Sequence, residues 1–188
     1  MNQLVAQAAE LQAVLDGQNW RSCLIGGLAV VRWGEPRLTR DVDVSLFAGF
    51  GSEESYARVL LARFEPRIND AMEFAVANRV LLLRGASGIP IDIALAGYPF
   101  EDEIIGRASD FEYVPGTSLR TISAEDLIVL KAFANRRHDW SDIAGICRRQ
   151  PSLDWSAIGA RLAPLAELKG APEILETLEG VRLESQPG

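Results

Sequence analysis

The stretch that decides the fold is residues 24–47, LIGGLAVVRWGEPRLTRDVDVSLF. It begins with an apolar run that breaks at Gly26-Gly27 and resumes directly after them. Two adjacent glycines allow a tight turn from a buried strand into a helix, because they add no side-chain bulk. Backbone N–H groups at the start of such a helix, with the helix dipole behind them, suit a phosphate. We therefore predict a strand that ends near Ile25, a phosphate-binding turn at the glycines, and a short helix that ends at Gly34.

The same stretch ends in a strand pattern that carries two aspartates. Polar and apolar residues alternate from Asp41 to Phe47, so Asp41 and Asp43 share one face of the strand while apolar residues occupy the other. Alternate strand residues lie about 6.6 Å apart, from a rise of roughly 3.3 Å per residue, and their carboxylates can converge on shared cations. Oxygen ligands of this kind suit Mg²⁺. Taken alone, two such aspartates also fit a merely solvated strand face.

Together, the glycine turn, the short helix and the Asp-x-Asp strand resemble the nucleotidyltransferases related to DNA polymerase beta. Residues 26–44 of this chain, GGLAVVRWGEPRLTRDVDV, match the pattern of that superfamily. The Gly-Gly version is similar to two branches, the abortive-infection type E toxins and the lincosamide-type drug nucleotidyltransferases. The wider superfamily has Gly-Ser where this chain has Gly26-Gly27, so a phosphate-binding hydroxyl is missing. The resemblance implies that Gly26 and Gly27 bind nucleotide phosphate and that Thr39 or Arg40 compensates for the serine.

A third aspartate stands in a later apolar strand pattern. In residues 89–95, IPIDIAL, the isoleucines and Leu95 occupy one face and leave Asp92 on the other. An ionised carboxylate in such surroundings needs a cation, a metal or hydrogen-bond donors, whereas the alternative is a strand-edge acid that faces water. The resemblance implies that Asp92 is a third metal-binding aspartate, because the superfamily carries one on a later strand. Asp70, in a turn-like segment, is the competing candidate.

The segment SAEDLIVLKAFANRRHDWSDI, residues 123–143, carries the second resemblance. In the toxin branch a helix lysine precedes a basic-Asp-x-x-Asp segment, and Lys131, Asp139 and Asp142 stand in those places. The resemblance implies that Lys131 reaches toward the triphosphate as a point charge and that Asp139 holds the lysine or lies near the site. The residues alone leave a structural alternative, in which Asp139 is the N-cap of a helix over 140–149 and Asp142 pairs with an arginine.

Composition and charge exclude several classes of protein. With 188 residues, 48% of them hydrophobic and 24% charged, the chain is long enough for one generous core or two small domains. A net charge of −7 argues against nonspecific coating of nucleic acid. The one histidine and two isolated cysteines support neither a zinc site nor a Ser-His-Asp triad. Without a ~20-residue apolar stretch or a signal-peptide pattern, we expect a cytoplasmic protein with no membrane partner.

Apolar periodicity and turn residues divide the rest of the chain into further elements. We predict helices over 2–16, from Ser52 to Pro66, over 99–107, from Ser123, over 140–149, from Asp154 and from Pro172, and strands over 22–25, 73–77, 79–84, 89–95, 111–114 and 119–122. The resulting fold class is α/β (α+β), a polymerase-beta-like mixed sheet with helices plus a helical carboxy-terminal lobe. We expect an N-terminal helix (1–19), a catalytic domain (20–116) and the helical lobe (117–188).

The resemblance implies a metal-dependent enzyme that moves a nucleoside monophosphate from a nucleoside triphosphate to a hydroxyl and releases pyrophosphate. Asp41, Asp43 and Asp92 would hold two Mg²⁺ ions, with Mn²⁺ as a substitute, and Asp92 would assist as a base. The basic residues within 120–150, six against four acidic ones, favour an RNA acceptor such as tRNA, in a toxin with a cognate antitoxin. A small-molecule (antibiotic) O-nucleotidyltransferase with an acceptor pocket lined by acidic residues of 99–112, and an inactive binding protein of this fold, are the alternatives.

Overall fold

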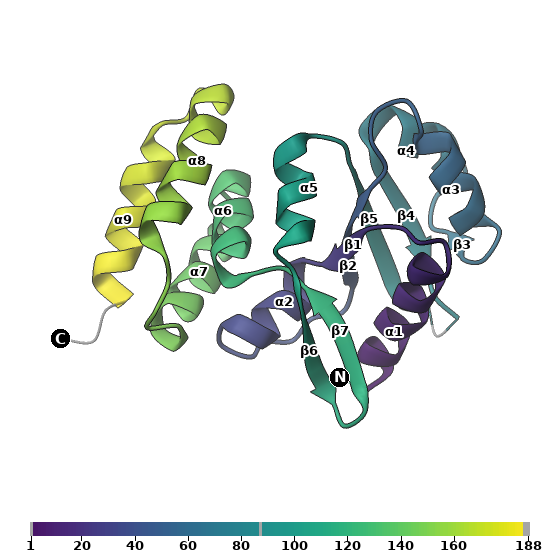
Figure 1. Ribbon diagram of the computed structural model, residues 1–188, viewed down its shortest axis with the longest axis horizontal. Helices are drawn as coiled ribbons and strands as arrows, with labels where there is room; N and C mark the ends of the chain where they lie inside the picture. Colours follow the sequence, from purple (N-terminus) through teal and green to yellow (C-terminus); the bar gives the residue numbers. More distant parts are fainter. Residues whose placement is uncertain (1, 87, 186–188) are drawn as a thin grey trace. The chain divides into compact units, whose positions relative to one another are not determined.

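The computed structural model describes residues 2–86 and 88–185 (Figure 1). They divide into two compact units. The first unit comprises the chain up to Leu28 together with Leu38–Ile122, and the second comprises Ala29–Arg37 together with the chain from Ser123 onward. Within the described ranges, no helix is long and apolar enough to cross a membrane.

The first unit contains a seven-stranded mixed sheet with the order β3-β4-β5-β2-β1-β7-β6. Strand β2 runs parallel to β5, and β1 runs parallel to β7, while the other neighbouring pairs are antiparallel. The mixed sheet confirms the fold class expected from the sequence. The strands are β1 (Ser22–Leu24), β2 (Val42–Phe47), β3 (Glu65–Pro66), β4 (Val80–Arg84), β5 (Pro90–Ala96), β6 (Ser109–Val114) and β7 (Thr117–Thr121).

One face of this sheet packs against helices and forms the core. The alternation along β2 and β5 places Val42, Val44, Ile91 and Ile93 in this core, each at most 3% exposed. Buried residues at helical spacing on α1 (Asn2–Gly17), α3 (Glu53–Leu61) and α4 (Ala71–Asn78) belong to the same cluster. Helix α5 (Pro99–Gly106) follows β5. Because the apolar side chains point to this face, the polar residues that alternate with them lie on the opposite face.

The strand predicted over 73–77 is wrong, because residues 71–78 form helix α4. A short apolar run fits a strand and a buried helix equally well, so its period decides little. In the folded chain Ala71 and Ala75, four residues apart, are the buried positions, and Arg79 ends the helix in the left-handed conformation at φ 55°. Asp70 occupies the N-cap position of this helix.

The second unit is helical, as the sequence predicts for the carboxy-terminal lobe. It contains the later part of α2 (Gly26–Trp33) and the helices α6 (Ala124–Ala134), α7 (Arg137–Arg149), α8 (Trp155–Lys169) and α9 (Glu173–Ser185), which are green to yellow in Figure 1. Each of the four carboxy-terminal helices buries an apolar stripe, with Ile128, Ile146, Leu162 and Ile174 at most 1% exposed.

Side chains close the ends of these helices. Ser123 accepts a hydrogen bond from the N–H of Asp126, and Asp154 accepts one from the N–H of Ala157, as expected for N-caps. Asp139 is not the N-cap of α7, because the helix begins earlier, at Arg137, and leaves Asp139 in its first turn. Its carboxylate is therefore available for a partner on another helix.

Candidate active site

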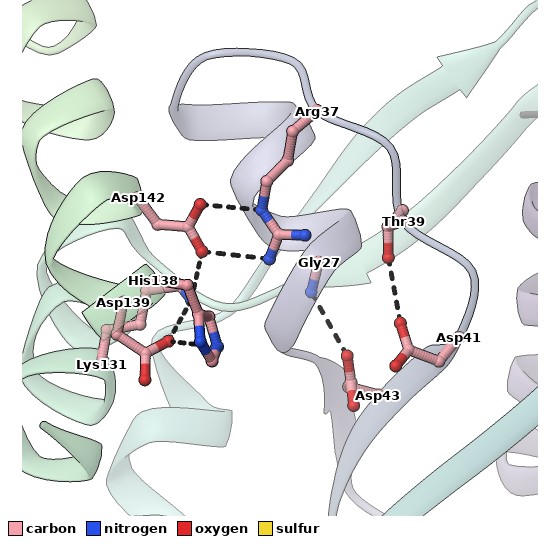
Figure 2. Close-up of polar contacts among 9 residues, drawn as sticks. All are labelled: Gly27, Arg37, Thr39, Asp41, Asp43, Lys131, His138, Asp139 and Asp142. Carbon is pink, nitrogen blue, oxygen red and sulfur yellow. Dashed lines mark hydrogen bonds and ion pairs between the residues drawn. The ribbon is translucent and has the colours of Figure 1, made fainter. Parts of the chain in front are cut away.

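Two of the three candidate aspartates lie side by side in the first unit. Asp43 on β2 is the register partner of Asp92 on β5, and because these strands are parallel and in register, both side chains leave the same face of the sheet. Asp41 directly precedes β2, and its Oδ1 accepts a hydrogen bond of 3.1 Å from Thr39 Oγ1 (Figure 2). The polar face of the sheet therefore gathers three carboxylates at the start of β2 and the middle of β5.

The glycine turn contacts this carboxylate group directly. The N–H of Gly27 donates to Asp43 Oδ2 at 3.3 Å (Figure 2), and Gly26 has φ +58°, in the left-handed region that favours glycine. A Cβ atom at Gly26 would lie 2.0 Å from Asp43 Oδ2, and one at Gly27 would lie 2.1 Å from Thr39 Oγ1. Both positions therefore require glycine, because the turn packs against the side chains that precede and begin β2.

Asp92 has a cationic partner in this structure. Its Oδ1 lies 2.7 Å from a terminal nitrogen of Arg67. The same oxygen is buried and has no well-aligned hydrogen bond among the described residues, so the contact is an ion pair rather than a directed hydrogen bond. Burial raises the pKa of Asp92, Arg67 opposes the rise, and the nearby charge of Asp41 adds to it.

The donor set of this site fits a hard divalent cation, although its arrangement is incomplete. Asp41, Asp43 and Asp92 offer only carboxylate oxygens, which are the ligands that Mg²⁺ prefers. Among residues 2–86 and 88–185, however, no group of three or more His, Cys, Asp or Glu side chains is placed so that it could hold a metal ion. The chemistry of the three aspartates therefore agrees with Mg²⁺, while the direction of the Asp92 side chain favours Arg67.

A second group of charged side chains lies within the helical unit, and we call it the charge cluster: Arg37, Lys131, Asp139 and Asp142. Lys131 Nζ donates to Asp139 Oδ1 at 2.8 Å and to Asp142 Oδ2 at 2.7 Å (Figure 2). Arg37 binds Asp142 with two hydrogen bonds, of 2.8 and 3.0 Å. The side chains of Lys131, Asp139 and Asp142 are only 6–8% exposed. Two cations and two anions balance each other within this cluster.

Burial raises the pKa of Asp142, but its contacts with Arg37 and Lys131 outweigh burial and hold the pKa below its ordinary value of 3.8. Asp139 Oδ2 is buried without a hydrogen-bond partner among the described residues, while Oδ1 receives Lys131 and lies 3.5 Å from the exposed imidazole of His138. Asp139 thus holds the lysine, and Asp142 pairs with an arginine as the structural alternative predicted while also binding Lys131.

Three-dimensional comparison with solved structures finds similar folds at low sequence identity. A crystal structure of an antigenic nucleotidyltransferase-like protein from Paracoccidioides brasiliensis matches with a TM-score of 0.56, at 17% identity over 95% of this chain and 93% of that chain. The chain has a nucleotidyltransferase-like fold. The lincomycin-bound lincosamide antibiotic adenylyltransferase LnuA matches with a TM-score of 0.52, at 14% identity over 75% of this chain and 94% of that chain. No protein-family model and no curated protein matches the sequence.

Within this nucleotidyltransferase-like fold, the residues predicted from the sequence fall into two groups. Gly26, Gly27, Thr39, Asp41, Asp43 and Asp92 lie in the sheet unit together with the exposed Arg40, whereas Lys131 and Asp139 lie in the helical unit. Sequence reasoning missed Arg67 and Arg37. Arg67 follows the two-residue strand β3, and Arg37 lies in the loop after α2. The sequence around each of them shows no pattern that would distinguish it from an ordinary surface arginine.

Three of the six basic residues of 120–150 have acidic partners. Arg120 pairs with Asp16 at 3.2 Å and Arg148 pairs with Glu35 at 2.9 Å, while Lys131 belongs to the charge cluster. The acidic residues of α5 are engaged as well: Glu101 accepts hydrogen bonds from the backbone N–H groups of residues 97 and 98, and Asp102 pairs with Arg21. Arg120, Lys131 and Arg148 are therefore held by acidic neighbours in the folded protein.

Proposed function

We propose that this protein is a metal-dependent nucleotidyltransferase that moves a nucleoside monophosphate from a nucleoside triphosphate to a hydroxyl of a small molecule. The observation that carries the proposal is the pairing of Asp43 with Asp92 in adjacent parallel strands, beside the Gly26-Gly27 turn that contacts Asp43. The nucleotidyltransferase-like fold supports the reaction class. Both features are needed, because a shared fold alone does not determine function.

Phosphoryl transfer of this kind depends on position and charge more than on covalent chemistry by the protein. Asp41 and Asp43 would hold Mg²⁺, and Asp92 would join them as a ligand or accept the acceptor's proton. When bound, the ion neutralises charge on the triphosphate and makes the acceptor hydroxyl more acidic. The chain itself supplies the carboxylates, the fixed register between them and the rigid turn that orients Asp43.

The turn also defines how the chain would bind phosphate without the serine of the wider superfamily. The N–H of Gly27 is already directed toward Asp43, so a phosphate carried by a metal on Asp43 would arrive close to the start of α2. The Thr39 hydroxyl donates to Asp41, which makes it a support for a metal ligand. Arg40 is exposed, so in this proposal it supplies the cationic contact to the nucleotide.

For the acceptor, two observations favour a small molecule over RNA. LnuA, whose structure holds lincomycin, is similar in fold over most of its own length, and three of the six basic residues of 120–150 pair with acidic neighbours. An RNA acceptor such as tRNA and a cognate antitoxin stay as predictions of the toxin resemblance. Lys131 and Asp139 bind each other in the charge cluster of the helical unit, and their contact with the nucleotide stays a prediction of the resemblance.

The test is transfer of labelled nucleotide. The protein is incubated with Mg²⁺ and each labelled nucleoside triphosphate, in separate reactions with a panel of lincosamides and aminoglycosides and with total cellular RNA. We expect label in the small-molecule fraction, and its loss in Asp43→Asn but not in Asp110→Asn, a matched change at an exposed position on β6. Label only in RNA would favour the toxin alternative. Absence of transfer to every acceptor would favour an inactive binding protein.

A further inference from the structure

Arg67 lies in the same cross-strand row as the candidate metal ligands. Its N–H donates to the carbonyl of Leu82 at 3.0 Å, Leu82 is the register partner of Asp92, and Asp92 is the register partner of Asp43. Directly paired residues of neighbouring strands have their side chains on the same face. Arg67, Leu82, Asp92 and Asp43 therefore form one row from the edge of the sheet to its middle.

The arginine side chain crosses β4 to reach the carboxylate. Neighbouring strands are about 4.8 Å apart, so the backbones of Arg67 and Asp92 are separated by roughly two such spacings, a span that a long arginine side chain covers and a shorter cation would not. The two side chains meet at 2.7 Å, with 23% of Arg67 and 36% of Asp92 exposed. The half-buried guanidinium thus occupies the space beside Asp92 Oδ1.

We propose that Arg67 is the resident cation of Asp92, so that the nucleotide-free protein holds one divalent cation, through Asp41 and Asp43, and Arg67 keeps a second from Asp92. This inference rests on the proposed function, because it concerns the same carboxylates. It explains why the described residues contain the three aspartates but no three-ligand metal group. It also places Arg67, which the sequence did not single out, in control of how many cations the site takes.

Charge balance supports this arrangement. The three aspartates carry three negative charges, which one divalent cation and one guanidinium neutralise. A second divalent cation would have to displace Arg67 or leave the site with excess positive charge until an anionic triphosphate enters. A guanidinium stays charged at every working pH and is covalently tethered beside Asp92, whereas a divalent ion such as Mg²⁺ would also have to give up bound water to compete with it. The tethered cation therefore has the advantage in the nucleotide-free state.

The number of bound cations tests the inference. Isothermal titration calorimetry with Mn²⁺, without nucleotide, is carried out on the wild type, Asp92→Asn, Arg67→Gln and the double variant Arg67→Gln/Asp92→Asn. We expect one equivalent of Mn²⁺ in the wild type and in Asp92→Asn, a second equivalent in Arg67→Gln, and its loss in the double variant. Arg63→Gln, at an exposed arginine four residues earlier, is the matched control and should bind one equivalent.

A second measurement needs no metal. In excess EDTA, the melting temperatures of the same four proteins form a double-mutant cycle, and the ion pair predicts that the shift of the double variant differs from the sum of the two single shifts. Additive shifts would overturn the pairing of Arg67 with Asp92. Two Mn²⁺ equivalents in the wild type, with one lost in Asp92→Asn, would overturn the control of cation number by Arg67. Failure of the proposed function looks different: no Mn²⁺ would bind to any protein, or binding would be unchanged by Asp43→Asn.

Discussion

Replacement of Lys131 by methionine should destabilise the helical unit strongly. The methionine keeps most of the apolar length of the side chain but removes the charge that Asp139 and Asp142 share, at 2.8 and 2.7 Å. Asp142 keeps its two hydrogen bonds to Arg37. Asp139 loses the lysine at Oδ1, and its Oδ2 already has no partner among the described residues, so Lys131→Met leaves a buried carboxylate with only the exposed imidazole of His138 nearby, 3.5 Å from Oδ1.

The expected cost follows from burial. Removal of one partner of a buried ion pair destabilises a protein by about 3–5 kcal/mol, and side chains that are 6–8% exposed have little water to compensate. That cost is a large part of a typical total stability of about 5–15 kcal/mol. At roughly 2–4 °C per kcal/mol for a chain of this size, the melting temperature should fall by about 6–20 °C.

Urea unfolding followed by tryptophan fluorescence measures this loss where it occurs, because Trp33, Trp140 and Trp155 lie in the helical unit and only Trp20 in the sheet unit. The second lysine of the chain supplies the control: Lys169 is exposed and donates to the Phe133 carbonyl, so Lys169→Met should lower the free energy of unfolding by only about 1 kcal/mol. The double variant Lys131→Met/Asp139→Asn should recover much of the loss, because it removes the unpaired charge.

Equal stability of the two lysine variants would refute this argument. The sequence resemblance predicts a different result for Lys131→Met, namely little loss of stability but weaker binding of a non-hydrolysable nucleoside triphosphate, by about 1.5–3 kcal/mol. Calorimetry with that nucleotide, on variants whose stability is known, separates a lysine that binds the triphosphate from one that joins α6 to α7.

The remaining predictions concern the turn, the acid limit and a helix cap. Gly27→Ala would bring its Cβ to 2.1 Å from Thr39 Oγ1, so it should lower stability and weaken Mn²⁺ binding, as measured by calorimetry. Thr39→Gly in the same chain should restore the fold, because it removes the clash. The pKa of Asp142 is lower in the folded protein than in the unfolded chain, so the ionised carboxylate stabilises the fold at pH values above its unfolded pKa. This stabilisation is lost as the pH falls through the folded pKa, which lies below 3.8. Urea unfolding at a series of pH values should show that the free energy of unfolding falls on acidification in the wild type and falls less in Asp142→Asn. Equal dependence of the two free energies on pH would contradict this prediction. Asp154→Ala removes the acceptor for the N–H of Ala157 at 2.9 Å and should cost about 1 kcal/mol in the same assay, and an unchanged midpoint would show that the cap is unimportant.

Most of the sheet and the helices followed from local patterns. Period-two alternation predicted β2 and β5 with their aspartates on one face, because successive strand residues must point to opposite sides. The paired glycines predicted the turn into α2, and Ser123 and Asp154 marked the starts of α6 and α8. The failure at 71–78 has the same origin: a short apolar run carries too few residues to distinguish one period from the other, so packing of α4 on the sheet decided.

The contents of the candidate site divide in the same way. The sequence by itself determined which residue types stand at the turn and on the polar face of the strands, because backbone geometry places neighbours within a strand or helix without reference to the rest of the chain. Only the tertiary structure decided the partners of those charges: Arg67 reaches Asp92 across β4, and Arg37 joins Lys131 at Asp142, over separations of 25 and 105 residues. A buried or half-buried charge accepts whichever opposite charge the fold brings near, and that choice depends on the packing of distant segments rather than on any local pattern.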